Sequence, residues 1–188
     1  MTVAGAALRR EGVTRGGRPF VIRPSRDGDA PELAALIDAV ASEGEFIVAV
    51  PGEPETLEQS ARLISIVLEG GLSLSLEVDG VLAGHVLAHR RAGRHYAHVA
   101  EIAIVVSNEH RRAGFGRMLM EMAIAWARAV GLAKLSLQVF PDNARAIALY
   151  RSLGFVDEGL ARGEVRMPSG DRDLLCMGLS LQRAPGAA

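Results

Sequence analysis

A glycine-containing turn between an apolar run and a long amphipathic segment constrains this chain most. The run ends at Val106, a polar loop follows, and Gly114 and Gly116 open a mostly apolar segment that reaches Val130. This pattern predicts a strand, a turn with exposed backbone amides, and the start of a helix. Unpaired N–H groups at a helix N-terminus favour an anion, and glycine lets the backbone approach a phosphate closely. The turn therefore indicates a phosphate-binding site.

Two common phosphate-binding loops fit this turn poorly. A Walker-type loop needs Gly-Lys-Ser/Thr at its end, but Arg117 and Met118 follow Gly116. A dinucleotide fingerprint needs a third small residue where Leu119 stands, and an acid at the end of the next strand. Residues 134–138 contain no such acid. The turn therefore favours neither ligand class.

Two short motifs match a third kind of phosphate-binding turn. Arg111-x-x-Gly114-x-Gly116 resembles the pyrophosphate-binding motif Q/R-x-x-G-x-G/A of the GNAT-type N-acetyltransferase superfamily. Residues 143–155 read NARAIALYRSLGF, which is similar to the second signature of that superfamily, N-x-x-A-x-x-L-Y-x-x-x-G-F. The motifs stand in the superfamily's order and spacing. The resemblance covers about residues 22–179.

The resemblance implies a fold, a cofactor and a set of site residues. The fold class would be α/β (α+β): a single domain with a mixed, mostly antiparallel central sheet flanked by helices, and a splayed parallel strand pair that holds acyl-CoA. Acetyl-CoA would be the co-substrate, without a metal. Pantetheine would bond the backbone of the first strand of that pair, and the loop amides would hold the pyrophosphate. The implied cofactor-binding residues are Ile104, Val105, Val106, Arg111, Arg112, Ala113, Gly114, Phe115, Gly116, Arg117, Asn143, Ala146 and Tyr150.

Two side chains could supply the proton transfers that acetyl transfer to an amine requires. Tyr150 occupies the tyrosine position of the second signature, and a phenol with a pKa of about 10 can protonate a leaving thiolate. Glu101 is an acid in an otherwise apolar strand, and it resembles the strand carboxylate that some members of the superfamily use as a general base. The simpler alternatives are a half-buried helix tyrosine and a carboxylate that pairs with an arginine or a backbone group. Asn143 is expected to cap the next helix and, as in relatives, to touch the cofactor.

Several histidines and acids are further candidate functional groups. His85 and His89 lie four apart on a predicted strand and so share a face, and His98 could approach them across the sheet. Their spacing is not that of a zinc site, so we expect no metal, and one histidine could line the acceptor cleft.

Residues 27–61 contain no lysine or arginine, although the formal net charge of the chain is only −1. A solvated helix face is the simple interpretation, and an acidic approach for a cationic amine is the functional one. The low net charge argues against general nucleic-acid binding. The acids in this stretch are Asp27, Asp29, Glu32, Asp38, Glu43, Glu45, Glu53, Glu55 and Glu58.

The length of 188 residues suits one domain. We expect a disordered arm over residues 1–18, the N-acetyltransferase domain over residues 19–180, and a disordered tail over residues 181–188. No apolar run reaches the roughly 18 residues that cross a bilayer, and residues 2–8 make no signal peptide. The lone Cys176 should pack in the core, and a cytoplasmic protein without membrane contact is the default expectation.

Hydrophobic periodicity and turn residues predict the elements. Asp29 should cap the first helix and Thr56 the second, and Asp79-Gly80 should turn a hairpin. The expected strands are 19–24, 72–78, 81–90, 97–106, 134–140, 155–165 and 171–179, and the expected helices are 27–42, 56–70, 116–130 and one that begins at residue 143.

The expected function is transfer of an acetyl group from acetyl-CoA to a primary amine of a small molecule or protein, by direct attack in a ternary complex. A homodimer is a possible assembly. The alternative from another class is a non-catalytic acyl-CoA sensor of the same fold. Tyr150 and Glu101, if both are functional, favour the enzyme.

Overall fold

The structure is a computed structural model of the chain, and it describes residues 8–44, 46–48, 60–62, 64–65, 70–91 and 93–182. The strands are β1 Arg10–Val13, β2 Pro19–Pro24, β3 Leu72–Val78, β4 Val81–Arg90, β5 Val99–Val106, β6 Lys134–Val139, β7 Val156–Met167 and β8 Gly170–Ser180. The helices are α1 Ala30–Ser42, α3 Phe115–Ala129 and α4 Ala144–Ser152, with 3-10 turns at Asp27–Asp29, Arg94–Tyr96 and Asn108–His110.

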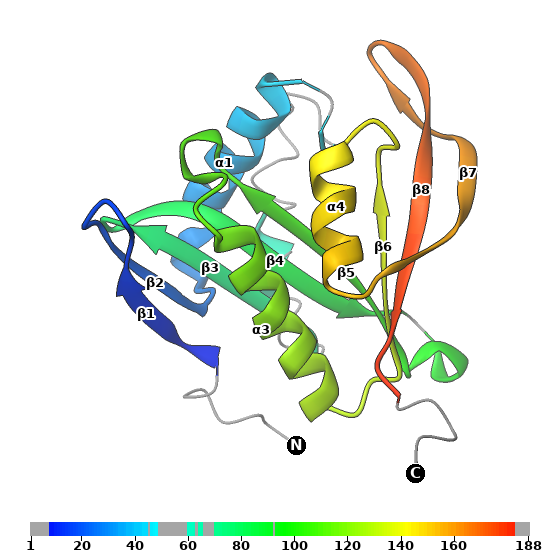
Figure 1. Cartoon of the computed structure of the whole chain (residues 1–188), viewed down its shortest axis with the longest axis horizontal. Helices are drawn as coiled ribbons and strands as arrows, with labels where there is room; N and C mark the ends of the chain where they lie inside the picture. The colour runs from blue at the N-terminus through cyan, green and yellow to red at the C-terminus, as the bar shows by residue number, and fades with distance from the viewer. Residues whose placement is uncertain are drawn as a thin grey trace.

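The strands form one mixed sheet in the order β1-β2-β3-β4-β5-β6-β8-β7 (Figure 1). The neighbours β5 and β6 pair in parallel, and the other neighbouring pairs are antiparallel. Helix α3 connects β5 to β6, as the predicted strand–helix–strand crossover requires. The fold class predicted from the sequence is confirmed.

Each face of the sheet has its own character, because side chains alternate along a strand. One face is apolar: Ile22, Leu74, Val86 and Ile102 pack with residues of α3 and α4 in a single core cluster. Trp126 of α3 is buried in that cluster. The opposite face is covered by α1, whose apolar side chains form a second cluster with residues of β4 and β5. Strand β5 contributes side chains to both clusters, so a site beside β5 would lie between the two layers.

The structure corrects the predicted ends of the domain. Residues 10–13 lie in the predicted disordered arm, yet they form β1, antiparallel to β2. The Thr14 hydroxyl accepts a hydrogen bond from the Arg18 amide at 3.0 Å, which closes this hairpin without an Asn-Gly or Asp-Gly signal. At the other end, the Leu181 amide donates to the Ala133 carbonyl at 2.8 Å. Residues 1–7 and 183–188 lie outside the described part of the chain.

Three other expectations have mixed outcomes. Cys176 is half-buried rather than a core residue, because it lies on the sheet face that α3 does not cover. The second helix is seen at residues 60–62 and 64–65, and its predicted cap Thr56 lies outside the described residues. Within the described chain, no helix is long and apolar enough to cross a membrane.

Candidate active site

The strands β5 and β6 separate part-way along their length. Their parallel ladder runs from the Val99–Lys134 pair to the Glu101–Ser136 pair and then stops, although β5 continues to Val106. Figure 1 shows the two strands diverging from that point, with α4 in front of the opening. The side of β5 that faces β6 is therefore left without a partner strand beyond Glu101.

Backbone groups of β5 point into this opening. In an antiparallel ladder, successive residues turn their N–H and C=O groups alternately to one neighbour and then the other. The Ser107 amide donates to the Ala83 carbonyl at 2.9 Å, which fixes odd-numbered residues of β5 toward β4. The N–H groups of Ile104 and Val106 consequently face the opening. This is the geometry that an extended chain needs in order to add to β5 as a strand.

The glycine loop presents a run of backbone amides to solvent. Those of residues 112–117 donate to no backbone carbonyl of the described chain, and the first bond of α3 runs from the Met118 amide to the Gly114 carbonyl at 3.1 Å. Gly114 has φ +87°, in the left-handed region that glycine adopts without cost. Arg112 has φ +65°, which is unusual for a residue with a side chain. Alternating backbone hands of this kind form an anion-binding concavity.

Arg111 braces the loop instead of facing the anion site. Its Nε donates to the Val106 carbonyl at 3.0 Å, and its Nη1 donates to Glu43 Oε2 at 2.5 Å. The guanidinium also lies 5.8 Å from the centre of the Phe46 ring. Its amide is used as well, because it donates to the Asn108 carbonyl at 3.2 Å. A direct contact from Arg111 to a phosphate would require it to leave these partners.

The side chains of three other residues in the predicted cofactor-binding set pack inside the fold or connect its helices. Val105 packs in the α1 cluster, and Phe115 lies edge-on to Phe20 at 5.2 Å between ring centres. Arg117 Nη2 donates to the Ser152 hydroxyl at 2.6 Å, which ties α3 to α4. Phe115 and Arg117 offer an approaching anion their backbone amides, as do Arg112, Ala113, Gly114 and Gly116. The Val105 amide faces β4 instead, so the structure does not turn Val105 toward the cofactor as predicted.

Gly116 sits where α3, α4 and β5 meet. A Cβ at this position would lie 3.3 Å from Leu149 and 4.0 Å from Ile104. The absent side chain therefore lets α4 pack close to the start of α3. A larger residue would require the end of the Leu149 side chain to shift by a few tenths of an ångström.

Asn143 caps α4 as the sequence predicts. Its Oδ1 accepts a hydrogen bond from the Ala146 amide at 3.2 Å. The side-chain NH2 of Asn143 is left to donate to a ligand, whereas the Ala146 N–H is already occupied. Of these two predicted cofactor contacts, the structure gives Asn143 the freer donor.

Tyr150 of α4 lies in the core cluster on the α3 face of the sheet. Its side chain is packed against Phe155, at 5.9 Å between ring centres, and the residue is 8% exposed. Burial raises the pKa of the phenol to about 12, so the hydroxyl keeps its proton well above neutral pH. Burial makes it a weaker acid than a phenol in water, but a thiolate formed in the same apolar surroundings would also be a stronger base.

Glu101 stands at the last paired position of the β5–β6 ladder. It is half-buried, and its carboxylate makes no hydrogen bond or ion pair with any residue that the structure describes. The arginine or backbone partner considered as its alternative role is therefore not seen there. Glu101 lies on the α1 face of the sheet, because it aligns with Ser136 and with His89, whereas Tyr150 packs on the α3 face.

The histidines differ sharply in their surroundings. His85 is buried, and its Nε2 lies 2.8 Å from the Ser73 hydroxyl. Burial lowers its pKa to about 4, against the raising effect of Asp29, so it is neutral at physiological pH. His89 is half-buried opposite Glu101, and His98 is exposed. The described residues contain no cluster of side chains suited to a metal ion.

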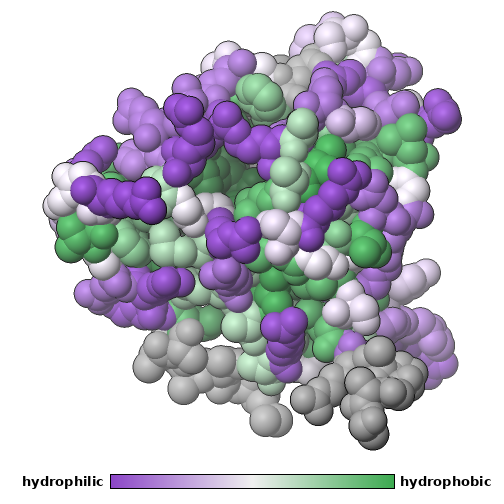
Figure 2. All heavy atoms as spheres, viewed as in Figure 1, coloured by the Kyte–Doolittle hydropathy of each residue, from purple (hydrophilic) through white to green (hydrophobic). Residues whose placement is uncertain are grey.

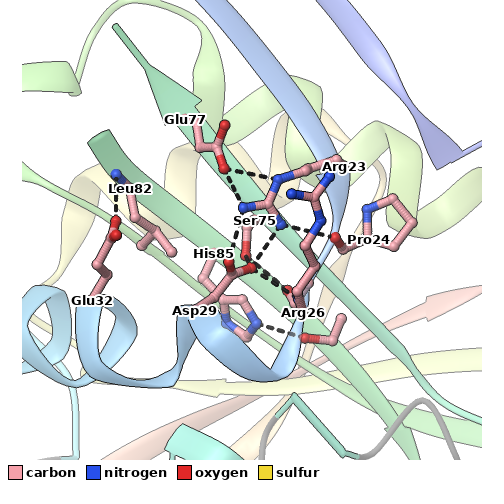
Figure 3. Close-up of polar contacts among 11 residues, drawn as sticks. Arg23, Pro24, Arg26, Asp29, Glu32, Ser75, Glu77, Leu82 and His85 are labelled. Carbon is pink, nitrogen blue, oxygen red and sulfur yellow. Dashed lines mark hydrogen bonds and ion pairs between the residues drawn. The ribbon is translucent and has the colours of Figure 1, made fainter. Parts of the chain in front are cut away.

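A buried charge network anchors the start of α1, and sequence reasoning missed it. Arg23 donates from both terminal nitrogens to Asp29, at 2.7 and 2.8 Å, and from Nε to Glu77 at 2.8 Å (Figure 3). Ser75 and the Arg26 amide also donate to Asp29, each at 2.9 Å. The prediction that the Asp29 side chain caps α1 is therefore wrong. Arg23 and its neighbours occupy both oxygens of the carboxylate.

Contacts made by several acids of residues 27–61 weaken the hypothesis that this stretch forms an acidic approach for a cationic amine. Asp29 is neutralised by Arg23, and Glu43 pairs with Arg111. Glu32 accepts a hydrogen bond from the Leu82 amide at 3.3 Å, beside the bulge between β3 and β4. Glu45, Glu53, Glu55 and Glu58 lie outside the described residues. On the side of the molecule shown in Figure 2, hydrophilic and apolar side chains are intermixed.

The sequence and the fold of this chain are both similar to those of known acetyltransferases. The chain matches the acetyltransferase (GNAT) family over residues 38–155. It belongs to this family. A GNAT acetyltransferase from Streptococcus pneumoniae has the same fold, with a TM-score of 0.77 and 28% identity over 86% of this chain and 98% of that one. A putative acetyltransferase from Salmonella typhimurium, solved with its cofactor acetyl-CoA, has a TM-score of 0.77 at 24% identity over 90% and 99% of the two chains.

The sequence relatives of this GNAT chain act on diverse acceptors, according to their names. Streptothricin acetyltransferase from Streptomyces lavendulae is 28% identical over 166 residues, which cover 78% of this chain and 87% of that protein. The alanine N-acetyltransferase of ribosomal protein bS18 from Salmonella typhimurium is 38% identical over 78 residues. That match covers 42% of this chain and 53% of the relative, so it spans about half of the relative's length.

Proposed function

We propose that this protein transfers an acetyl group from acetyl-CoA to a primary amine, by direct attack within a ternary complex. The observation that carries the proposal is the opening between β5 and β6 together with the loop that follows β5. The backbone amides of residues 112–117 in this loop donate to no backbone carbonyl of the described chain. The opening suits an extended pantetheine arm, and the loop suits a pyrophosphate. Membership of the GNAT family supports the same assignment.

The backbone would place and activate the thioester. Pantetheine would bond to the N–H groups of Ile104 and Val106 that face the opening, as an added strand does. A backbone N–H at this site would also polarise the thioester carbonyl, because it points at the oxygen on which negative charge develops. Holding both reactants in the opening would turn a bimolecular reaction into an intramolecular one.

The two proton transfers would fall to side chains on opposite faces of the sheet. Glu101 would accept the proton of the attacking amine, directly or through water, because its carboxylate has no competing partner in the described chain. Tyr150 would protonate the leaving thiolate, because burial keeps its hydroxyl protonated. Asn143 would add a donor to the cofactor near the start of α4.

The acceptor is assigned here only as an amine of a small molecule or of a protein. Names of relatives include acetyltransferases for streptothricin, for the alanine of a ribosomal protein, for L-amino acids and for spermidine. The amine is the chemistry that these acceptors share. The cytoplasmic location and the homodimer remain predictions of the sequence.

One screen tests the proposal. Purified protein is incubated with acetyl-CoA and a panel of amines that includes amino acids, polyamines, aminoglycoside-like compounds and peptides, and free thiol release is recorded. The proposal expects amine-dependent release, with acetylation of the amine confirmed by mass spectrometry. Tight binding of acetyl-CoA with no release on any amine would favour the acyl-CoA sensor instead, and absence of binding would refute both.

A further inference from the structure

Two polar side chains that have no partner among the described residues lie side by side on the α1 side of the sheet. His89 of β4 and Glu101 of β5 are directly opposite in the antiparallel ladder. The Cβ atoms of such a pair are about 4.5–5.5 Å apart, close enough for an imidazole and a carboxylate to meet. His89 Nδ1 is buried and has no hydrogen-bond partner among the residues that the structure describes. Leaving a buried polar atom unpaired costs free energy, so its position calls for an explanation.

The other titratable side chains on this face are already engaged. Among the described residues of β4, β5 and β6, this face also carries His85 and Lys134, and Arg91 follows β4 in the same alternation. Their partners are Ser73 for His85 at 2.8 Å, Glu158 for Lys134 at 2.7 Å, and the ring of Tyr96 for Arg91 at 5.2 Å. On this face of the three strands, His89 and Glu101 are therefore the titratable side chains that have no partner among the described residues.

We propose that His89 is a positioning residue for Glu101, an inference that rests on the proposed function. In the occupied site, its Nδ1–H donates to the Glu101 carboxylate, because catalytic hydrogen bonds tighten when a reactant is bound. The bond holds the imidazole in the Nδ1–H tautomer and turns the carboxylate toward the opening. A donor to the ionised carboxylate also favours its charged form, which is the form that can accept a proton from the amine.

Kinetics of matched variants test the positioning role. His89→Leu removes the donor, whereas His89→Asn keeps an amide N–H near the position of Nδ1. The control is His98→Asn at an exposed histidine outside the site. His89→Leu should lower kcat about ten- to a hundredfold with the KM for acetyl-CoA unchanged, and His89→Asn should recover much of it.

The pH profile separates positioning from simple packing. Because the lost donor had favoured the charged carboxylate, the acid-side fall of the His89→Leu profile should move up by about one pH unit. The His98→Asn profile should match the wild type. A His89→Leu variant that is folded by circular dichroism, yet matches the control in kcat and in pH profile, overturns the proposal.

A second readout does not depend on turnover. The nitrogen-15 spectrum of His89, recorded with coenzyme A bound, should show the Nδ1–H tautomer in the wild type and the Nε2–H tautomer in Glu101→Met, which lacks the acceptor oxygens. The same tautomer in both proteins refutes the pairing. A tautomer that responds to Glu101→Met in a protein that acetylates no amine would uphold the pairing and refute the proposed function.

Discussion

Placing a negative charge in the glycine loop should weaken coenzyme A binding, whereas a neutral side chain of the same shape should not. Gly114 has φ +87°, and a Cβ built there meets nothing within 4 Å. Gly114→Asp and Gly114→Asn therefore both fit, and both accept a similar left-handed backbone cost, since Asn and Asp tolerate that region better than other residues. The difference between them isolates the charge.

The size of this difference follows from Coulomb's law. A unit charge about 5 Å from another interacts by about 0.8 kcal/mol in water-like surroundings, and the pyrophosphate carries roughly two charges. Gly114 is exposed, so the water-like value applies. The expected penalty is about 1.5 kcal/mol, which is roughly a tenfold rise in Kd for Gly114→Asp relative to Gly114→Asn.

Titration calorimetry with coenzyme A at low salt measures both Kd values. Raising the salt toward 0.5 M should shrink the difference, because the Debye length falls below about 5 Å. Gly131→Asp is a matched control at the other end of α3, with φ +75° and no atom within 4 Å of its Cβ, and it should leave the Kd unchanged. Equal Kd values for Gly114→Asp and Gly114→Asn at low salt would refute the assignment of this loop to the pyrophosphate.

Further variants test the proton transfers and the scaffold. Tyr150→Phe should lower turnover about ten- to a thousandfold with little change in coenzyme A affinity, and a change within twofold would assign the acid elsewhere. Glu101→Gln should remove the acid-side break of the pH–rate profile, and a profile that keeps this break would make another group the base. Asp29→Ala should lower the free energy of unfolding by about 3–5 kcal/mol in urea titrations, because the buried Arg23 would lose both hydrogen bonds to Asp29 and keep only Glu77 as a charged partner, whereas Glu121→Ala at an exposed pair should cost below about 0.5 kcal/mol. Equal unfolding midpoints for these last two variants would contradict the role given to the buried network.

The Asp29 variant also has a defined pH dependence. Burial opposes ionisation of this carboxyl, but hydrogen bonds from Arg23, the Arg26 amide and Ser75, with the charge of Arg23, hold its pKa below the usual value. A depressed pKa in the folded state contributes stability that is fully present above the unfolded value of about 3.9 and is lost as the pH falls below it. The gap in stability between wild type and Asp29→Ala should therefore narrow in acid.

Much of this fold could be predicted from the sequence, because strand ends, turns and helix caps depend on residues that are close together in the chain. The ends of β2, β3 and β4 follow from alternation and turn residues, and the cap of α4 follows from Asn143 and its spacing to the helix. The glycine loop was readable because φ +87° at Gly114 favours glycine, and because Gly116 lies in tight contact with the Leu149 side chain. Such requirements leave a mark in the residue type itself.

Contacts between distant residues left no comparable mark. Arg111 belongs to the phosphate motif, yet its side chain binds Glu43, 68 positions away. Ser75 donates to Asp29 from 46 positions away and, with Arg23, removes Asp29 from its expected capping role. The point where β5 and β6 part depends on the register of two strands, and neither strand's sequence alone specifies it. Arg112 shows a backbone conformation that its residue type does not announce.

The central claim is that acetyl-CoA lies in the opening beside β5 with its pyrophosphate on the glycine loop. Amide hydrogen exchange with and without coenzyme A, resolved by residue, tests this claim most directly. The account predicts slower exchange at Ile104, at Val106 and across residues 112–117, with little change along β1 and β2. Saturating coenzyme A that leaves these amides exchanging at the rates of the free protein, or that protects a different surface, would contradict it.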